Sequence, residues 1–289
     1  MSLLQVIVLA VVQGLAELLP VSSSAHVIVA EKLMGLDPSS PPMTLLLVML
    51  HTGTMFAVIV YFWRQWRDTY FRSRAAFKNA AVTIVLATAI TGIVGEALIK
   101  IIEKTVFAGA KGAQIEDLFG HLEIIAPALA AAGVLILVAG LSSRRKAAST
   151  ADRAAEVNTG QAGLIGAVQG LSLPFRGFSR SGATISVGML TDVPKSTAEA
   201  FSFALAVVLT PVVVGREAIR LIRVEPAGGP GTMFSAFTPS LLGALLAFVA
   251  GLLALKWLSR WLETGRWYIF GIYCLIAAAV VFGLHQSGY

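Results

Sequence analysis

The sequence contains very little charge for its length. Only 13% of its 289 residues are Asp, Glu, Lys or Arg, whereas 56% are hydrophobic. Soluble domains usually carry about 25% charged residues. The composition therefore excludes an ordinary soluble protein and indicates an integral membrane protein.

Cysteine and N-terminal basic residues are also scarce. The single cysteine, Cys274, excludes an intramolecular disulfide. The first basic residue is Lys32, so the apolar N-terminus lacks the basic region of a cleaved signal peptide, and we expect none. The net charge of +6 does not indicate nucleic-acid binding, because the basic residues lie in short segments between apolar runs, where membrane topology places them.

Six apolar runs are long enough to cross about 30 Å of hydrocarbon, which takes roughly 20 helical residues. They cover residues 43–63, 80–102, 122–141, 200–222, 239–258 and 268–285. Regions 1–42 and 160–199 are also apolar, but Pro, Gly and Ser divide them into shorter pieces. Such pieces are typical of re-entrant segments, whose irregular backbone must be satisfied by protein or by a wet cavity.

The charge of the connecting segments orients these spans. The segments rich in Lys and Arg are 64–79, 142–159 and 259–267, and those poor in net positive charge are 103–121 and 223–238. The lysine and arginine bias places the first three in the cytoplasm and the other two outside. The spans then alternate consistently only if region 1–42 dips in from the outside and region 160–199 from the cytoplasm.

We therefore predict one all-α membrane domain over residues 1–289, with six transmembrane helices and two re-entrant helical segments. Its two halves, 1–141 and 160–285, would form an inverted-topology repeat joined by a cytoplasmic loop at 142–159. Repeats of this kind place their site near the axis that relates the halves, between discontinuous helices.

Two motifs place charged and hydroxyl residues inside the broken segments. The first reads QGLAELLPVSSSAH from Gln13 to His26, and the second reads QGLSLPFRGFSRSGAT from Gln169 to Thr184. An ionisable residue at membrane depth costs a few kcal/mol or more, which makes it a sign of function. Because the motifs resemble each other, we expect one site assembled from both.

The first motif supplies a carboxylate and candidate nucleophiles. Gln13 and Glu17 are four residues apart and share a helix face, and the amide oxygen of Gln13 suits a metal shell. Three serines follow the proline that ends this helix, and simple helix capping is the alternative interpretation for Ser22 and Ser24. Ser23 is the best nucleophile candidate, because it lies three residues before His26 on the same helical face.

The second motif supplies an anion site. Free N–H groups at a helix start bind anions, and Arg180 matches phosphate oxygens with a bidentate fork. The residues that we expect to bind substrate are Ser22, Gly177, Ser179, Ser181 and Thr184. Together the two motifs indicate phosphoryl chemistry. Outside them, His51 can contact a ligand, but a hydrogen-bonded role in helix packing is favoured.

The motifs resemble those of the undecaprenyl-diphosphatase family, also called bacitracin-resistance proteins. The Glu/Gln-x-x-x-Glu motif of that family is matched by Gln13 and Glu17, with Gln13 as its non-acidic option. Its P-V-S-S-x-x-H run is matched by residues 20–26, and its S-R-S-x-x-T run by residues 179–184. Arg176 stands where the family usually has a proline, and Ala25 replaces a common glycine.

The resemblance implies hydrolysis of undecaprenyl diphosphate at the outer face of a bacterial inner membrane, which recycles the lipid carrier for cell-wall synthesis. It also implies a divalent cation, magnesium or calcium, with Glu17 and Gln13 as ligands. Glu17 would bind the cation or act as base, Ser23 would be the nucleophile or its hydrogen-bond partner, His26 would transfer a proton and Arg180 would stabilise charge. Whether Ser23, His26 or an activated water attacks stays open.

The expected partners are a prenyl diphosphate lipid and the surrounding membrane lipids, with no nucleic acid, and a homodimer is compatible with the sequence. A lipid-phosphate or anion transporter, or a flippase, is the competing interpretation, because inverted repeats are common in transporters. A pure carrier, however, has little use for Glu17, Ser23 and His26 together.

Overall fold

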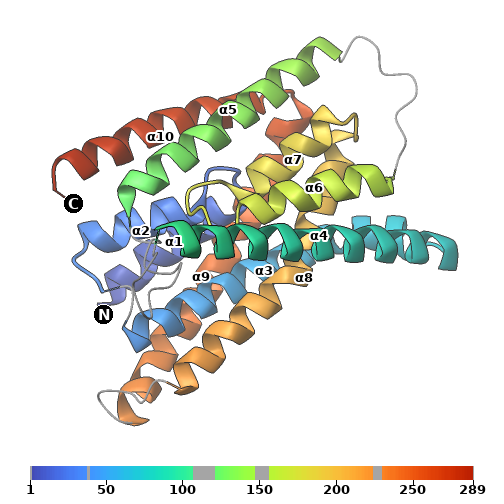
Figure 1. Ribbon diagram of the computed structural model, residues 1–289. Coiled ribbons are helices and arrows are strands. Elements are labelled where there is room, and N and C mark those ends of the chain that lie inside the picture. Colours follow the sequence, from blue (N-terminus) through green and yellow to red (C-terminus); the bar gives the residue numbers. More distant parts are fainter. Residues whose placement is uncertain (1, 38–39, 107–120, 147–155, 224–229, 289) are drawn as a thin grey trace.

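The computed structural model describes residues 2–37, 40–106, 121–146, 156–223 and 230–288. Over these residues the chain forms ten α-helices and no strand (Figure 1). The helices are α1 (Leu3–Leu18), α2 (Ser23–Leu33), α3 (Pro41–Tyr70), α4 (Arg74–Val106), α5 (Leu122–Lys146), α6 (Thr159–Leu171), α7 (Arg180–Leu190), α8 (Lys195–Arg223), α9 (Pro230–Glu263) and α10 (Tyr268–Gln286). The prediction of an all-α protein is confirmed.

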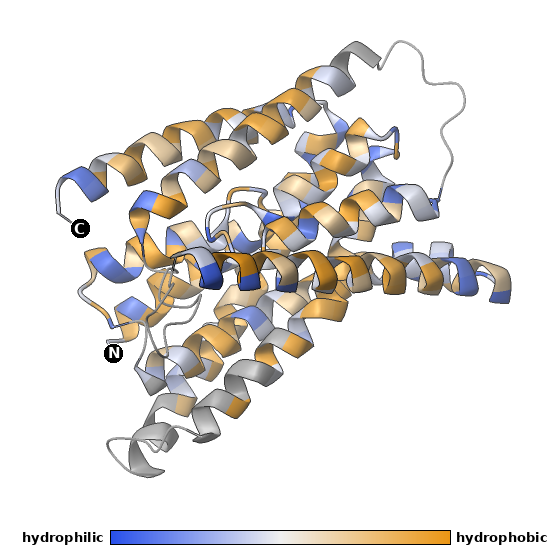
Figure 2. Ribbon diagram, in the orientation of Figure 1, coloured by the Kyte–Doolittle hydropathy of each residue, from blue (hydrophilic) through white to orange (hydrophobic). Residues whose placement is uncertain are grey.

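Five of the described helices are long and apolar enough to cross a membrane, namely α3, α4, α5, α9 and α10. Apolar residues run along most of their length (Figure 2), and large side chains such as Ile93 and Val85 are 69% and 66% exposed. Such a surface suits contact with lipid, and the chain is a multi-pass membrane protein. The sixth predicted run, 200–222, lies in α8, which is 29 residues long but is not one of these five.

The two motif regions form pairs of short helices, as their Pro, Gly and Ser content predicts. Region 1–42 contains α1 and α2, of 16 and 11 residues, before α3 begins. Region 160–199 contains most of α6, which has 13 residues, and α7, which has 11. At 1.5 Å per residue these helices are about 16–24 Å long, so none of them crosses the hydrocarbon alone.

The same capping interaction starts α1 and α6. The side chain of Ser2 accepts a hydrogen bond from the Gln5 N–H, and the Gln5 side chain accepts one from the Ser2 N–H. Asn158 and Gln161 form the same reciprocal pair at α6. Each pair satisfies two N–H groups that a helix start otherwise leaves without partners.

Glycines bring the short helices against long ones. Helix α1 packs on α9, and α6 packs on α4. A Cβ added at Gly14 would lie 2.5 Å from the Cβ of Ala250, and one added at Gly170 would lie 2.7 Å from the Cβ of Val94. Larger residues would therefore push the helices apart, which is why small residues are favoured at such contacts in membranes.

The turn between α1 and α2 lies against both α7 and α10. A Cβ added at Gly182, in the first turn of α7, would lie 3.1 Å from the carbonyl oxygen of Pro20. From α10, the thiol of Cys274 donates to the same oxygen across 3.6 Å. The two motifs, which are more than 140 residues apart in the chain, are thus packed together.

Candidate functional site

Glu17, at the end of α1, is the residue at which the two motifs meet. Its Oε1 accepts a hydrogen bond from the Arg180 guanidinium at 2.6 Å. Its Oε2 accepts one from Ser23 Oγ, also at 2.6 Å. The side chains of Glu17 and Arg180 are only 14% and 22% exposed. The structure therefore brings together three of the four residues that the sequence predicts to be catalytic.

Two further side chains face Oε2 of Glu17. Gln13 donates to it from Nε2 at 3.1 Å, and His51 Nε2 lies 3.8 Å away. The other ring nitrogen of His51 bonds the carbonyl of Leu47 at 2.8 Å. His51 is thus hydrogen-bonded within its own helix, its role in helix packing and its contact with a ligand stay predictions, and its approach to Glu17 is an addition that the sequence did not predict.

A small hollow of about 10 Å³ opens beside Glu17 and Arg180. Two hydroxyl groups line it, from Thr54 on α3 and Thr210 on α8. The rest of its lining is apolar and consists of Leu18, Met55, Val58, Phe203, Ala206 and Val207. The charged pair therefore lies beside a mainly apolar lining.

Local backbone geometry sets the direction of Arg180. Gly177 has a φ of 105°, and a Cβ added there would lie 2.5 Å from the carbonyl oxygen of Ile125. Ser179 then caps α7 by accepting from the Gly182 N–H at 3.2 Å. Arg180 is the first residue of the helix, so the turn and the cap together hold its side chain near α1.

Ser181 and Thr184, both predicted to bind substrate, are 4% and 1% exposed. The Thr184 hydroxyl donates to the Arg180 carbonyl at 2.8 Å and shares a hydrogen bond with the Ser202 hydroxyl of α8. These bonds fix the first turn of α7 against α8. Thr184 therefore holds the backbone of Arg180 in place, and its predicted contact with substrate stays a prediction.

Both ring nitrogens of His26 form hydrogen bonds with groups other than Glu17. Its Nδ1 lies 2.8 Å from the Ser22 carbonyl oxygen, and its Nε2 lies 2.8 Å from the hydroxyl of Tyr273 on α10. Ser22 itself has a φ of 69° and makes no side-chain capping bond, so the capping interpretation is wrong for this serine. Tyr273 lies in an apolar run without a motif, and only its hydroxyl could have drawn attention to it.

The expected divalent cation stays a prediction, because both oxygens of Glu17 accept hydrogen bonds and Gln13 faces Glu17 with Nε2. Among the described residues, no group of three or more His, Cys, Asp or Glu is placed to hold a metal ion. Mg²⁺, however, is commonly bound by one or two carboxylates together with substrate phosphates and water. Glu17 would be the carboxylate of such a site.

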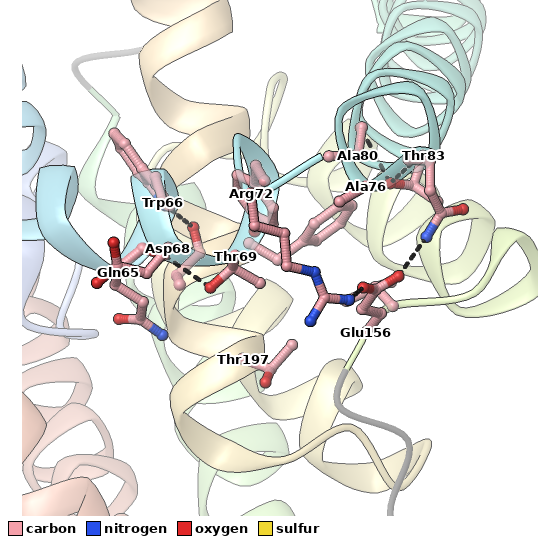
Figure 3. A pocket seen from close by; sticks show the side chains of 15 residues that line it. Gln65, Trp66, Asp68, Thr69, Arg72, Ala76, Ala80, Thr83, Glu156 and Thr197 are labelled. Atoms are coloured by element: carbon pink, nitrogen blue, oxygen red, sulfur yellow. Dashed lines mark hydrogen bonds and ion pairs between the residues drawn. The ribbon is translucent and has the colours of Figure 1, made fainter. Parts of the chain in front are cut away.

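A larger cavity, of about 240 Å³, lies at the turn between α3 and α4 (Figure 3). Arg72 and Asn79 both bond the carboxylate of Glu156 there, the latter at 2.8 Å. These bonds connect the start of α4 to the segment before α6. None of the motif residues lines this cavity, so it is separate from the Glu17 cluster.

Comparison with known proteins gives a consistent result. Residues 6–280 match the family described as "Bacitracin resistance protein BacA". Undecaprenyl-diphosphatase 2 of Acinetobacter baylyi is 56% identical to this chain over 287 residues, which cover 98% of each protein. Undecaprenyl-diphosphatases of Desulfatibacillum aliphaticivorans and Rhodopirellula baltica are 31% and 29% identical, over 97% of this chain and 98% and 97% of theirs.

Proposed function

This chain belongs to the bacitracin resistance protein BacA family, and we propose that it is an enzyme that hydrolyses undecaprenyl diphosphate to undecaprenyl phosphate and inorganic phosphate. The reaction recycles the lipid carrier of bacterial cell-wall synthesis. The observation that carries the proposal is the convergence of Ser23 and Arg180 on the two oxygens of Glu17. A hydroxyl, an acceptor for its proton and a guanidinium are the groups that phosphoryl transfer to a serine requires.

The proposed architecture is six spans and two re-entrant helix pairs in one domain, with halves that are inverted relative to each other. Equivalent interactions at one constant offset support it. The capping residues Ser2 and Asn158 are 156 positions apart (158 minus 2). The contact of Gly14 with Ala250 is repeated by that of Gly170 with Val94. The two glycines are 156 positions apart (170 minus 14), and so are their two partners (250 minus 94). The first-half glycine contacts the second half of the chain, and the second-half glycine contacts the first half.

We propose further that the protein lies in a bacterial inner membrane with its site open to the periplasm or cell exterior. The support is the Lys and Arg content of segments 64–79, 142–159 and 259–267, which favours the cytoplasm. With these segments inside, the α1–α2 pair enters from the outside. The diphosphate could then reach Glu17 while the prenyl chain stays in lipid.

In the first proposed step, Ser23 Oγ attacks the terminal phosphorus and its proton passes to Oε2 of Glu17. The bond from that phosphorus to the bridging oxygen breaks, and undecaprenyl phosphate leaves. A guanidinium has five N–H donors, so Arg180 can keep its bond to Glu17 and also stabilise the equatorial phosphoryl oxygens. The 2.6 Å contact of Ser23 with Glu17 supports this direction of proton transfer.

In the second step, water attacks the phosphoserine and gives one proton to Nε2 of His26. Glu17 returns its proton to Ser23 Oγ as the phosphorus–oxygen bond breaks, which releases phosphate and restores the serine. His26 lies one helical turn after Ser23, about 4.5 Å along α2. Direct attack by water on the diphosphate, with Glu17 or His26 as base, is the alternative that this geometry also permits.

In the alternative in which Glu17 binds a cation instead of acting as base, magnesium or calcium would be held by Glu17 and Gln13 and would neutralise charge on the phosphate oxygens. The transporter interpretation has weaker support. The relatives are named as diphosphatases, and the three groups around Glu17 suit phosphoryl transfer better than transport of a lipid phosphate or anion. No observation specifically favours a flippase.

The test is phosphate release from a long-chain prenyl diphosphate by the purified protein in detergent, with and without EDTA. Glu17→Ala should reduce turnover by at least about a hundredfold, because it removes both the proton acceptor and the partner of Arg180. Loss of activity in EDTA and its recovery with Mg²⁺ would support the cation. Failure of the wild-type protein to release phosphate with Mg²⁺ present would contradict the function.

A further inference from the structure

The contact between His26 and Tyr273 joins the two halves of the chain. The Tyr273 hydroxyl lies 2.8 Å from His26 Nε2, and the two rings stack with centroids 5.7 Å apart and planes inclined by 12°. His26 belongs to α2, whereas Tyr273 belongs to α10, 247 positions later. The neighbouring Cys274 bonds the Pro20 carbonyl, so α10 touches the first motif at two places.

The second contact of His26 determines which ring nitrogen carries the proton. Nδ1 lies 2.8 Å from the Ser22 carbonyl oxygen. A carbonyl can only accept, so Nδ1 is the protonated nitrogen and Nε2 of the neutral ring carries the lone pair. The Tyr273 hydroxyl therefore donates to Nε2, and the chain of bonds runs from Tyr273 through His26 to Ser22.

The backbone conformation of Ser22 indicates that the fold fixes the orientation of the His26 ring. A φ of 69° is unfavourable for a serine, so it persists only where the surroundings fix it. Ser22 is 6% exposed, and its carbonyl is the group that holds His26 Nδ1. One end of the imidazole is thus anchored by a strained backbone and the other end by Tyr273.

We propose that Tyr273 relays a proton to His26 in the phosphatase reaction. Its hydroxyl gives its own proton to Nε2 and takes one from the attacking water, so the proton of the water reaches His26 through the hydrogen bond that is already formed. This inference rests on the proposed role of His26. Tyr273 is 45% exposed, which makes a purely structural contribution to the protein core small.

The test compares Tyr273→Phe, His26→Ala and the double variant in the full-length protein. Phenylalanine keeps the stacked ring and removes only the hydroxyl. We expect Tyr273→Phe to lower kcat about three- to tenfold, with KM within about twofold, since one neutral hydrogen bond is lost. His26→Ala should lower kcat at least about a hundredfold, as loss of an acid–base group does. Adding Tyr273→Phe to His26→Ala should cause no further loss.

Tyr70→Phe is the matched control, because it removes a hydroxyl at the cavity between α3 and α4 and should leave kcat unchanged. Thermal unfolding of each variant checks folding, and His26→Asn replaces the alanine variant if that protein does not purify. Full activity of Tyr273→Phe beside an impaired His26→Ala would overturn only the inference about Tyr273. An equal loss from Tyr273→Phe in both backgrounds would also overturn it. Full activity of His26→Ala would remove the proposed role of His26 itself.

Discussion

Replacing Glu17 by glutamine tests whether the contact between the two motifs is catalytic or only structural. The change keeps the shape of the side chain but removes the charge that Arg180 and Ser23 bond at 2.6 Å each. Removal of one partner from a buried ion pair costs about 3–5 kcal/mol. Because both side chains keep some exposure, 14% and 22%, we expect about 3 kcal/mol in the free energy of unfolding. Turnover should fall at least about a hundredfold.

The double variant Glu17→Gln with Arg180→Gln separates the two effects. It has no unpaired charge, so most of the lost stability should return, since neutral replacements of buried pairs are often tolerated. Activity should stay at the level of the worse single variant, because neither the proton acceptor nor the guanidinium is restored. Phosphate release and thermal unfolding are measured on the same purified samples. Recovery of activity together with stability would refute the catalytic interpretation.

Three further predictions concern the surroundings of the cluster. Gly177→Ala should reduce both stability and turnover, because its Cβ would lie 2.5 Å from the Ile125 carbonyl oxygen at a φ of 105°; unfolding and phosphate release of the variant check this. Ser22→Gly should be at least as stable as the wild type and about 1 kcal/mol more stable than Ser22→Ala, because only glycine tolerates the φ of 69°; equal unfolding of the two variants would contradict this. Arg72→Gln should leave turnover unchanged, because the Arg72–Glu156 pair lies in the separate cavity; a large loss in the phosphate assay would connect that cavity to the reaction.

The sequence predicts the cluster around Glu17 well because its members belong to motifs that place charged and hydroxyl residues inside apolar segments. A carboxylate and an arginine at membrane depth need partners, and the nearest equivalent motif supplies each with one. The break between α1 and α2 contains Pro20, and the break between α6 and α7 contains Gly177, whose φ is positive. Five of the six predicted apolar runs coincide with helices long enough to span a membrane, because length and apolar composition can be read directly from the sequence.

The contacts of His26, Tyr273 and His51 could not be predicted from spacing. Tyr273 reaches His26 from a helix that begins near residue 268, and the register of α10 against α2 is set by packing rather than by local sequence. His51 reads as a residue of an ordinary span, and its distance of 3.8 Å from Glu17 depends on how α3 lies beside α1. Ser22 reads as a cap, but the sharp turn after Pro20 forces a backbone conformation in which it does not cap α2.

The most direct test of the central claim is a comparison of Ser23→Ala with Ser24→Ala in the phosphate-release assay. The two serines are adjacent, but it is Ser23 whose hydroxyl donates to Glu17, at 2.6 Å. If the cluster of Glu17, Ser23 and Arg180 is the catalytic centre, Ser23→Ala should lower kcat at least about a hundredfold and Ser24→Ala no more than about twofold. Equal and mild effects of the two substitutions would contradict the account and leave an activated water as the attacking group.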